Sequence, residues 1–328
     1  MSSLLLLTED DVQALLRPAE AVDAVERAFY DFAHGTAVMP PKLYLEFDQH
    51  AGDLRVMPAS LGSGYAGVKI VNSHERNPAR GLPAVVGTYL LYSQETGMPL
   101  SIMGATFLTA MRTGAASAVA CKYLARRDSR SLGLVGAGVQ AGFQTRAISQ
   151  VLSLETVRAW APDNDRPRRD ALLGKLQQEF PELEFMPAQS LEEAAAADVV
   201  CTTTPSRAPL VRAGAVLPGT HINAVGADGP GKQELDPVIL KDARIVVDEW
   251  HQALAGGEVN VPVGEGIIGE GDIAGTLSDL VSGAIEGRMS SDEITIFDST
   301  GLAIQDIAVA TLVYERALSE GRGTKIHV

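Results

Sequence analysis

The chain has 328 residues, of which 46% are hydrophobic and 21% charged, and this globular composition excludes an intrinsically disordered protein. The formal net charge of −14 makes nucleic acid and anionic membrane surfaces poor partners. Two cysteines, Cys121 and Cys201, exclude a disulfide framework and a cysteine-rich metal site. Because uncharged stretches stay shorter than ~18 residues and the start lacks a basic signal region, we expect a cytoplasmic protein without a transmembrane helix.

The first third of the chain mixes helix and strand patterns. The apolar run at residues 4–7 predicts a first strand or the lead-in to a helix. Residues 8–33 have apolar side chains at helical spacing, with Thr8 as the expected cap. Four β-like segments follow between residues 42 and 92, separated by Gly, Pro and Asp turns. Residues 106–126 predict a long helix rich in small side chains.

Short apolar strands then alternate with helices, which predicts βαβ units and a parallel sheet covered on both faces. The strands are expected at residues 131–135, 156–160, 183–186, 198–203, 221–226, 244–248 and 295–297, and helices at 139–152, 166–180 and 191–197. A final amphipathic helix at 302–318 is expected to return to the first domain. The predicted fold class is therefore α/β, with residues 126–301 as a Rossmann dinucleotide-binding domain and residues 1–125 plus 302–328 as a second domain.

A glycine-rich turn follows the first of these strands, where residues 131–141 read SLGLVGAGVQA. Gly136 allows a tight turn, Gly138 lets the backbone approach a pyrophosphate, and Ala141 permits close packing of helix on strand. The amides at the start of the helix can then hold the phosphates. The strand before and the helix after the turn favour a dinucleotide site over a plain glycine turn.

The next strand should reveal which dinucleotide is bound, because an acid at its end grips the ribose of NAD. Ala161 stands there instead, with Asp163 two residues later and Arg166 close behind. Both NAD and NADP therefore stay open. NAD is slightly favoured, because Asp163 and Asp165 would repel the 2′-phosphate of NADP.

Two basic residues are candidates for substrate binding. Lys69 lies between apolar neighbours on an expected strand, where it either faces water or occupies a pocket. Tyr65 and Lys69 mimic a helical Tyr/Lys pair, but on a strand they would lie about 13 Å apart, so that pairing is rejected. Arg112, set among small residues of an expected helix, forms either a helix salt bridge or a fork for a carboxylate.

A second glycine-rich loop, GADGPGK at residues 226–232, follows an apolar strand. It would lie at the carboxyl end of a parallel strand, where open α/β sheets bind their ligands. Asp228 is its acid, and the alternative is an Asp that only stabilises a turn. The six histidines have no metal-binding spacing, so we predict no metal.

At these residues the chain resembles the ornithine cyclodeaminase/μ-crystallin family, and most closely its archaeal-type alanine dehydrogenase branch. The resemblance spans nearly the whole chain and rests on GVKIVN (67–72), TAMRTGAASA (109–118), VGAGVQA (135–141), TTTPSRAPLV (202–211), GTHINAVGADGPGKQELD (219–236) and EITIFDSTGLAIQDIAVA (293–310). It implies a Rossmann domain together with a second α/β domain that dimerises and supplies substrate contacts.

The resemblance also implies roles for individual residues. Lys69 and Arg112 would bind the substrate carboxylate, with Lys69 a candidate proton carrier and Asp228 the acid/base. The cofactor would be lined by Arg112, Thr113, Gly136, Ala137, Gly138, Val139, Gln140, Asp163, Thr202, Val225, Lys232 and Ser299. The cyclodeaminase branch has a glutamate where this chain has Arg55, which suits a carboxylate or a small uncharged side chain instead. The site is thus expected to be basic, with four cations around one aspartate.

The function that follows from the resemblance is an NAD(P)-dependent oxidoreductase acting as a homodimer. It would interconvert an L-amino acid and its 2-oxo acid plus ammonia through an imine. Reduction of a preformed ketimine, such as pyrroline-2-carboxylate, is the second interpretation. Ornithine cyclodeamination is a third, which Arg55 disfavours by repelling the distal ammonium. A non-catalytic, cofactor-dependent binding protein of the crystallin type is the fourth.

Overall fold

The computed structural model describes residues 3–74 and 76–327. They form two compact units: unit 1 is Met1–Arg112 with Leu302–Val328, and unit 2 is Thr113–Gly301. The boundary between them falls inside helix α3 (Thr106–Leu124), whereas the sequence pattern places it after that helix. The functional division at residues 125 and 301 stays a prediction.

Unit 1 is built on a seven-stranded sheet with the order β17-β1-β6-β5-β4-β3-β2. Its strands are β1 (Ser3–Leu7), β2 (Leu43–Phe47), β3 (Gly52–Leu61), β4 (Tyr65–His74), β5 (Val85–Ser93), β6 (Pro99–Gly104) and β17 (Thr324–His327). The pairing is antiparallel except between β1 and β6. Strands β6 and β17 were not predicted. The prediction that residues 295–297 form the last strand is wrong, because the chain end adds β17 beside β1.

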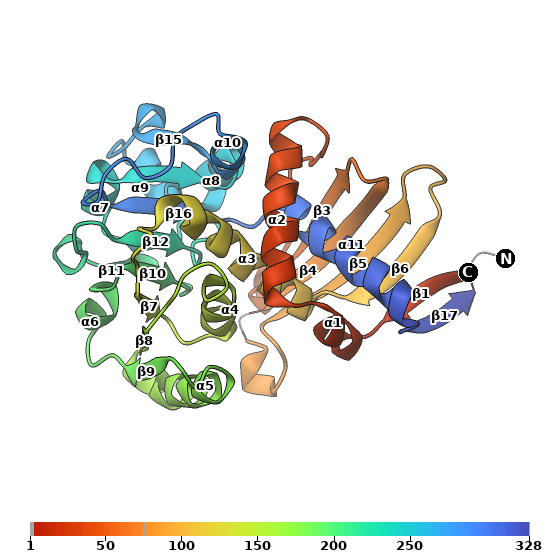
Figure 1. Cartoon of the computed structure of the whole chain (residues 1–328), viewed down its shortest axis with the longest axis horizontal. Coiled ribbons are helices and arrows are strands. Elements are labelled where there is room, and N and C mark those ends of the chain that lie inside the picture. Colours follow the sequence, from red (N-terminus) through yellow and green to blue (C-terminus); the bar gives the residue numbers. More distant parts are fainter. Residues whose placement is uncertain (1–2, 75, 328) are drawn as a thin grey trace. The chain divides into compact units, whose positions relative to one another are not determined.

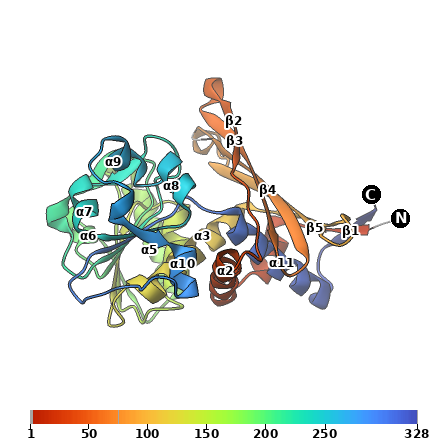
Figure 2. The ribbon, with the colours of Figure 1, turned by 90° about the horizontal axis from the view of Figure 1, so that it is seen from above.

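The helices of unit 1 are α1 (Glu9–Leu15), α2 (Pro18–Ala33), α11 (Ala303–Glu320) and the first part of α3. The prediction of one helix over residues 8–33 is wrong, because Leu16 is extended and Pro18, which has no amide hydrogen, begins a new helix. Helix α11 packs on β3, β4 and β5 and beside α2. Figure 2 shows α2 and α11 on one face of this sheet.

The opposite face of the sheet in unit 1 carries exposed apolar side chains. Leu43 and Leu45 of β2 are 67% and 57% exposed, and they lie opposite Val56 and Leu54 of β3. Because side chains alternate along a strand, this is the face away from Met57, which is buried. Of the described residues, no helix covers this face in Figure 2.

Unit 2 contains an eight-stranded sheet with the order β15-β14-β16-β12-β10-β7-β8-β9, which Figure 1 shows from the top of the unit to its bottom. Its strands are β7 (Ser131–Val135), β8 (Thr156–Trp160), β9 (Glu184–Pro187), β10 (Val199–Thr202), β12 (His221–Ala224), β14 (Arg244–Val247), β15 (Ile273–Thr276) and β16 (Thr295–Asp298). Every pair of neighbours is parallel. The strand order reverses between β7 and β10, where such sheets bind ligands.

The remaining strands of unit 2 are short and escaped prediction. Strands β11 (Arg207–Val211) and β13 (Gln233–Leu235) form a separate parallel pair. Strand β15 escaped prediction because it is only four residues long and contains Gly275.

The helices of unit 2 are α4 (Val139–Ile148), α5 (Arg166–Glu179), α6 (Leu191–Ala195), α7 (Pro237–Asp242), α8 (Trp250–Gly256), α9 (Asn260–Gly264), α10 (Leu277–Ser282) and the rest of α3. Short 3₁₀ turns lie at Asp48–His50, Pro78–Arg80, Asp163–Asp165, Ala213–Ala215 and Glu270–Asp272.

Gly114 explains the small residues predicted in α3, since a Cβ there would lie 2.5 Å from the Phe143 carbonyl oxygen of α4. Buried Val135, Val200 and Ile222 form part of the sheet core.

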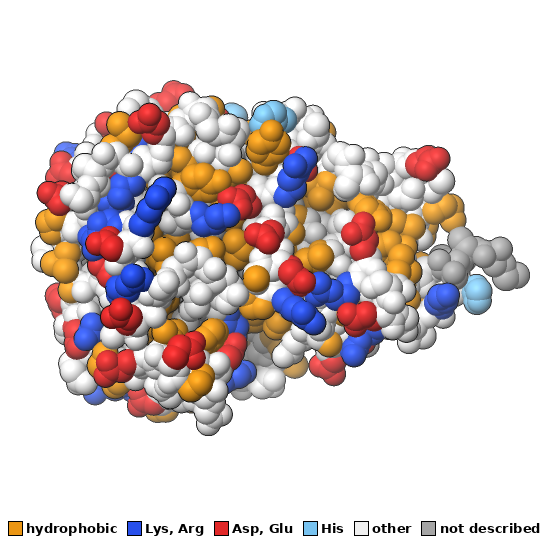
Figure 3. All heavy atoms as spheres, viewed as in Figure 1, with side chains coloured by type: hydrophobic (Ala, Val, Ile, Leu, Met, Phe, Trp, Pro, Cys, Tyr) orange, Lys and Arg blue, Asp and Glu red, His pale blue; other side chains and the backbone are white. Residues whose placement is uncertain are grey.

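The surface shows no separation of charge on the face drawn in Figure 3, where acidic and basic side chains are interspersed. The net charge of −14 is therefore not gathered into one patch on that face. None of the helices in the described part of the chain combines the length and apolarity needed to span a membrane.

Candidate functional site

Unit 1 contains a buried ionic cluster that brings two predicted site residues together. Lys69 comes from β4, Arg112 from α3 and Asp306 from α11. Lys69 Nζ lies 2.7 Å from Asp306 Oδ1, and Arg112 Nε lies 2.9 Å from the same oxygen. Arg112 Nη1 also donates to Gln305 Oε1 at 2.8 Å. Asp306 was not predicted, although it lies inside the segment 293–310 on which the family resemblance rests, with apolar residues on either side of Gln305 and Asp306.

Burial decides the question that the sequence left open for Lys69. The side chain has no exposed surface, so it does not face water. Desolvation, followed by the nearby Arg112 charge, lowers the pKa of Lys69 from 10.5 to about 7, while Asp306 acts in the opposite direction. A lysine with a pKa near neutrality can exchange a proton at working pH.

The cluster has more positive charge than negative charge. When Lys69 is protonated, two cations share the single Asp306 carboxylate, which leaves one positive charge in a buried place. Asp306 Oδ2, Gln305 Nε2 and the Tyr89 hydroxyl are buried with no hydrogen-bond partner among the described residues. Buried polar groups are normally satisfied, so Gln305 Nε2 and the Tyr89 hydroxyl have unused capacity to donate to an anionic ligand, and Asp306 Oδ2 has unused capacity to accept from a donor.

Arg55 lies on the same sheet face as Lys69, but it already has a carboxylate partner. Its strand neighbour Met57 stands opposite Lys69, and Arg55 stands opposite Val71. Arg55 Nε and Nη2 donate to the two oxygens of Asp53 at 3.0 Å and 2.9 Å. The guanidinium carbon also lies 5.5 Å from the ring centroid of Tyr44.

The expectation of four cations around one aspartate is therefore wrong. Asp53 pairs with Arg55, Asp306 with Lys69 and Arg112, and Asp228 with Lys232. Of these three carboxylates, the sequence predicts a role for Asp228 alone. Of these three ion-pair groups, the one formed by Lys69, Arg112 and Asp306 has two cations on one carboxylate.

In unit 2 the glycine turn has the geometry that a pyrophosphate requires. Gly136 has φ +104°, and a Cβ there would lie 2.9 Å from Thr203 Oγ1 and 3.0 Å from Thr204 Cγ2. At Gly138 the nearest atom to a Cβ would be 3.9 Å away, so the turn is open at that point. Helix α4 begins directly afterwards without a side-chain cap, which leaves its first amides available to an anion.

Other predicted cofactor residues lie at the same edge of the sheet. Thr202 ends β10, Val225 follows β12 and Ser299 follows β16, and the carboxyl ends of parallel strands share one edge. Ser299 Oγ and Gln140 Oε1 are buried without a partner among the described residues. These polar atoms and the glycine turn fit a dinucleotide. Ala137 belongs to the turn itself, Val139 begins α4, and Thr113 is buried in α3.

The end of β8 has no acidic residue that would select NAD over NADP. Ala161 is buried there and offers no acid. Asp163 and Arg166 pair with each other at 2.8 Å, and both are exposed. The sequence reasoning missed Arg168, whose Nη2 is the atom 3.9 Å from the Cβ position of Gly138. Its signal was a basic residue in the first turn of α5, next to the glycine loop.

Asp228 lies in the loop between β12 and β13, as the sequence predicts. Its Oδ1 accepts from Lys232 Nζ at 2.6 Å, and its side chain is 35% exposed. The loop follows the carboxyl end of β12, on the edge that also holds Ser299. A carboxylate paired with an ammonium and still open to solvent can exchange a proton with a ligand.

Four buried acids of unit 2, which the sequence reasoning missed, bind the backbone of neighbouring loops. Glu234 accepts from the Thr204 and Gly226 amides, and Glu258 accepts from the Glu234 and Leu235 amides. Asp298 accepts from the Glu258 and Val259 amides, and Asp248 from the Thr300 and Gly301 amides. Burial raises the pKa of Glu234 and of Glu258, and it raises that of Asp298 to about 8. Among the described residues, no group of three or more His, Cys, Asp or Glu could hold a metal ion.

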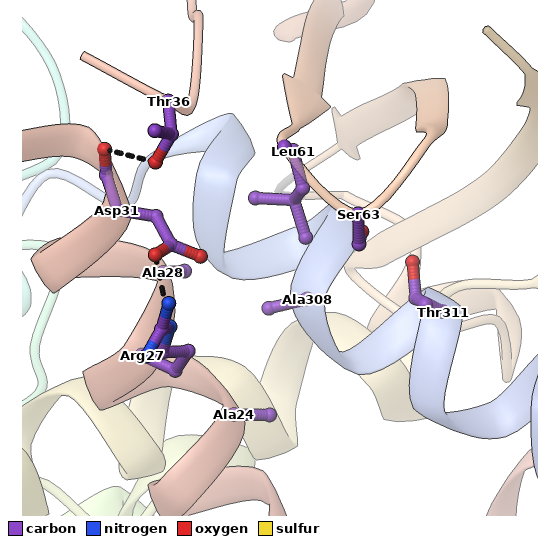
Figure 4. Close-up of a pocket in the computed structure, with 10 residues that line it drawn as sticks. Ala24, Arg27, Ala28, Asp31, Thr36, Leu61, Ser63, Ala308 and Thr311 are labelled. Carbon is purple, nitrogen blue, oxygen red and sulfur yellow. Dashed lines mark hydrogen bonds and ion pairs between the residues drawn. The ribbon is translucent and has the colours of Figure 1, made fainter. Parts of the chain in front are cut away.

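A hollow of about 440 Å³ in unit 1 lies apart from the predicted residues. Figure 4 shows it between α2, α11 and the turn after β3, with the Arg27–Asp31 ion pair on one side. Its lining includes none of the residues that the sequence proposed for the site.

The parallel sheet, its strand order and the open glycine turn define a dinucleotide-binding α/β protein. The chain belongs to the ornithine cyclodeaminase/mu-crystallin family, whose model matches residues 3–321. The predicted family and fold class are thereby confirmed.

Individual relatives cover the chain almost completely. An alanine dehydrogenase of Archaeoglobus fulgidus is 52% identical over 322 residues, which are 98% of each chain. A solved archaeal alanine dehydrogenase dimer with bound NAD has a TM-score of 0.94 and 50% identity, with 99% of both chains covered. The Thermococcus litoralis Delta(1)-pyrroline-2-carboxylate reductase, in complex with NADH and L-proline, has a TM-score of 0.95 and 37% identity over 98% of this chain and all of that one. The predicted likeness to archaeal alanine dehydrogenase and the oxidoreductase class are confirmed.

Proposed function

We propose that this protein is an NAD-dependent amino-acid dehydrogenase that interconverts a small L-amino acid and its 2-oxo acid plus ammonia. The observation that carries the proposal is the buried pair of Lys69 and Arg112, which shares one carboxylate. The similarity to an alanine dehydrogenase over nearly the full length supports the same reaction.

The substrate carboxylate binds to Lys69 and Arg112. Protonated Lys69 and the guanidinium together have one positive charge more than Asp306 balances, so one added carboxylate neutralises the cluster. Hydrogen bonds between charged groups in a buried place are the strong ones. The two cations thus fix the carboxylate end of the substrate and orient the α-carbon.

The state of Arg55 favours a small, uncharged substrate side chain. Its guanidinium is held by both oxygens of Asp53, so its charge is already balanced. A substrate with a second carboxylate would have to compete with Asp53 for this group. Pyruvate and alanine are therefore favoured over oxaloacetate and aspartate.

Asp228 and Lys69 handle the protons. Asp228, paired with Lys232 and partly open to solvent, takes the proton from the reacting amine or returns it to the imine. Lys69, with a pKa lowered to about 7, is the second group that can hold or release a proton near neutral pH. Lys69 and Arg112 keep the role of substrate ligands that the resemblance implies. Arg55, expected to bind substrate, is paired with Asp53, and Lys232, expected to line the cofactor, is paired with Asp228 and orients it.

NAD would be held by the glycine turn at Gly136 and Gly138, by the start of α4, and by Thr202, Val225 and Ser299. When bound, the nicotinamide supplies or accepts the hydride. Three relatives or neighbours with NAD, NAD⁺ or NADH support this cofactor. NADP stays an alternative, because Ala161 does not provide the acid that would exclude its 2′-phosphate.

We also propose a homodimer that forms through the uncovered face of the sheet in unit 1. Exposed apolar patches of this kind mark association surfaces, and Leu43 and Leu45 lie on it. A second copy is the occupant that the archaeal alanine dehydrogenase dimer supports. The cytoplasmic location stays a prediction.

The reaction is tested by following the oxidation of NADH and NADPH with three substrate sets. These are pyruvate plus ammonia, oxaloacetate plus ammonia, and pyrroline-2-carboxylate alone. We expect the largest kcat/KM with NADH, pyruvate and ammonia, and L-alanine as product. Oxidation that needs no ammonia would instead assign the ketimine reductase function, which the Thermococcus litoralis relative makes the second candidate.

Two further outcomes would overturn the proposal. Release of ammonia from ornithine without net change in NADH would identify a cyclodeaminase. Tight binding of the cofactor with no turnover of any keto acid or imine would identify a binding protein.

The roles of the residues are tested with Asp228→Asn and Lys69→Ala. We expect each to lower kcat/KM by about 10²-fold or more, the range of one acid–base group. The exposed residues Asp242 and Lys241 give matched controls, Asp242→Asn and Lys241→Ala, which should keep the wild-type rate. Near-wild-type turnover in Asp228→Asn and Lys69→Ala would refute the assignment.

A further inference from the structure

The loop that carries Asp228 is held at both ends by side chains from other parts of unit 2. At its start, the Gly226 amide donates to Glu234 Oε2 at 2.9 Å. At its end, Asn260 Oδ1 accepts from the Gly231 amide at 3.0 Å, and Asn260 Nδ2 donates to the Lys232 carbonyl at 3.0 Å. One amide side chain thus binds this backbone as a neighbouring strand would.

Asn260 is itself fixed in place. It begins α9, its backbone amide donates to the Gly257 carbonyl at 3.1 Å, and its Nδ2 donates to that same oxygen. The two residues before it are anchored to the end of β16, since Asp298 accepts from the Glu258 amide at 2.9 Å and the Val259 amide at 3.1 Å. Asn260 therefore connects the loop to a rigid strand end.

The middle of the loop is supported from the same side. A Cβ at Gly256 would lie 2.8 Å from the Gly229 Cα, so the end of α8 touches the loop backbone. Gly231, with φ +73°, makes the turn that brings its amide to Asn260. The backbone of the loop is therefore contacted at its middle as well as at its two ends.

The chemistry of Asn260 suits this place. Lys232, whose carbonyl accepts from Asn260, is the residue whose ammonium binds Asp228 at 2.6 Å. An aspartate at position 260 would lose the donor to that carbonyl and add a negative charge close to Asp228. The neutral amide supplies an acceptor and two donors, and the structure uses all three.

We propose that Asn260 is a positioning residue that sets the place of the Asp228–Lys232 pair for proton transfer. This inference rests on the proposed role of Asp228 and goes beyond it, because it assigns the placement of the Asp228 carboxylate to a side chain of helix α9. Small displacements of a reacting group are costly, and about 1 Å can lower a rate about 100-fold.

The first test is Asn260→Ala, compared with Gln150→Ala as the matched control. Gln150 also donates its side-chain amide to a backbone carbonyl in unit 2, that of Arg146 at 3.1 Å. We expect Asn260→Ala to lower kcat about 10-fold to 100-fold while the Kd for NADH changes less than about 2-fold. Gln150→Ala should change neither value. Equal effects of the two variants on kcat would overturn the proposal.

The second test is a double-mutant cycle with Asp228→Asn. If Asn260 acts through Asp228, adding Asn260→Ala to Asp228→Asn should cost less than about 3-fold in kcat. The same loss in both backgrounds would show a general structural role and would refute positioning. Wild-type turnover in Asp228→Asn would instead refute the proposed role of Asp228, whatever Asn260→Ala does.

Hydrogen exchange separates loop mobility from loss of fold. In Asn260→Ala, amides of residues 226–232 should exchange about 10-fold faster while peptides from β7 and β10 stay unchanged. Unchanged exchange in the loop would overturn the proposal. If Asn260→Ala does not fold, Asn260→Asp takes its place, because it keeps the acceptor for Gly231 and loses the donor to Lys232. Wild-type kcat in that variant would then refute the role of the donor.

Discussion

Lys69 Nζ lies 2.7 Å from Asp306 Oδ1, and neither side chain has any exposed surface. Asp306 also binds Arg112, so one carboxylate keeps two cations in place inside unit 1. Buried ion pairs are costly to break, because the remaining charge cannot return to water. The pair is therefore a structural element of the fold as well as the proposed place of the substrate carboxylate.

Asp306→Asn should destabilise unit 1. Removing the carboxylate leaves Lys69 and Arg112 buried beside each other with no anion, which costs about 3 kcal/mol of unfolding free energy. Denaturant unfolding measures it. Glu315→Gln, on the exposed side of the same helix, removes only a contact with Tyr65 and should cost under about 0.5 kcal/mol. A loss in Asp306→Asn as small as this would contradict the account.

The pH dependence of kcat/KM for the 2-oxo acid should follow Lys69. Its pKa is lowered to about 7, so the side chain is charged below that pH and neutral above it. A neutral amine binds the carboxylate about tenfold more weakly than an ammonium. We expect kcat/KM to fall as pH rises through about 7, and this limb to be absent in Lys69→Met. The same limb in the variant would assign it to another group.

The free energy of unfolding should also depend on the titration of Lys69, but it should rise with pH where kcat/KM falls. The folded pKa of Lys69 lies below its unfolded value of 10.5, so the unfolded chain binds more protons between about pH 7 and 10.5. The contribution of Lys69 to stability therefore rises with pH in that window and is smallest below it. Comparing urea unfolding of wild type and Lys69→Met across the window isolates this contribution. A difference that does not change with pH would contradict a lowered pKa.

Gly136→Ala should weaken NADH binding by more than about 10-fold. Gly136 has φ +104°, which L side chains rarely adopt. The new Cβ would also lie only 2.9 Å from Thr203 Oγ1 and 3.0 Å from Thr204 Cγ2, so the turn must shift. Fluorescence titration with NADH gives the Kd. The matched control is Gly174→Ala in α5, where a Cβ meets nothing within 4 Å. Unchanged affinity in Gly136→Ala would argue against a cofactor at this turn.

Arg168→Ala should weaken the binding of NADH about 10-fold, the value of one charge-assisted hydrogen bond. The guanidinium is the group nearest to the Cβ position of Gly138, which places it beside the expected phosphates. Arg166→Ala, which removes only the exposed pair with Asp163, is the control and should change little. Titration with NADPH as well shows whether Arg168 also binds the 2′-phosphate. If Arg168→Ala and Arg166→Ala bind alike, Arg168 is no ligand.

Leu43→Asp combined with Leu45→Asp should break the homodimer. Both side chains lie exposed on the uncovered sheet face, and two charges there cannot be buried against a second copy. Light scattering after size exclusion should show the molecular mass halved. Leu217→Asp, at an exposed leucine of unit 2, should leave the mass unchanged. A dimer that survives both changes would place the interface elsewhere.

The elements that the sequence predicted well are those with a local signal. The alternation of apolar runs with helical periodicity predicted β7, β8 and β10, and the glycine spacing predicted the turn at Gly136. Strands β11, β13 and β15 have three to five residues each and depend on their neighbours for pairing, so their sequences gave no period to read. The break between α1 and α2 has a local signal, because Pro18 cannot continue a helix, although the apolar periodicity of residues 8–33 predicts one helix.

The sequence by itself determined the α/β class, the family, and the residue types at the glycine turn, at Lys69, at Arg112 and at Asp228. These features depend on the order and spacing of residues that are near one another in the sequence, so they can be recognised without knowing the fold. Only the tertiary structure decided the partners: Asp306 for Lys69, Asp53 for Arg55, and Asn260 for the Asp228 loop. The physical reason is that burial and ion pairing join side chains from distant parts of the chain, so the charge state of Lys69 is set by a residue 237 positions away.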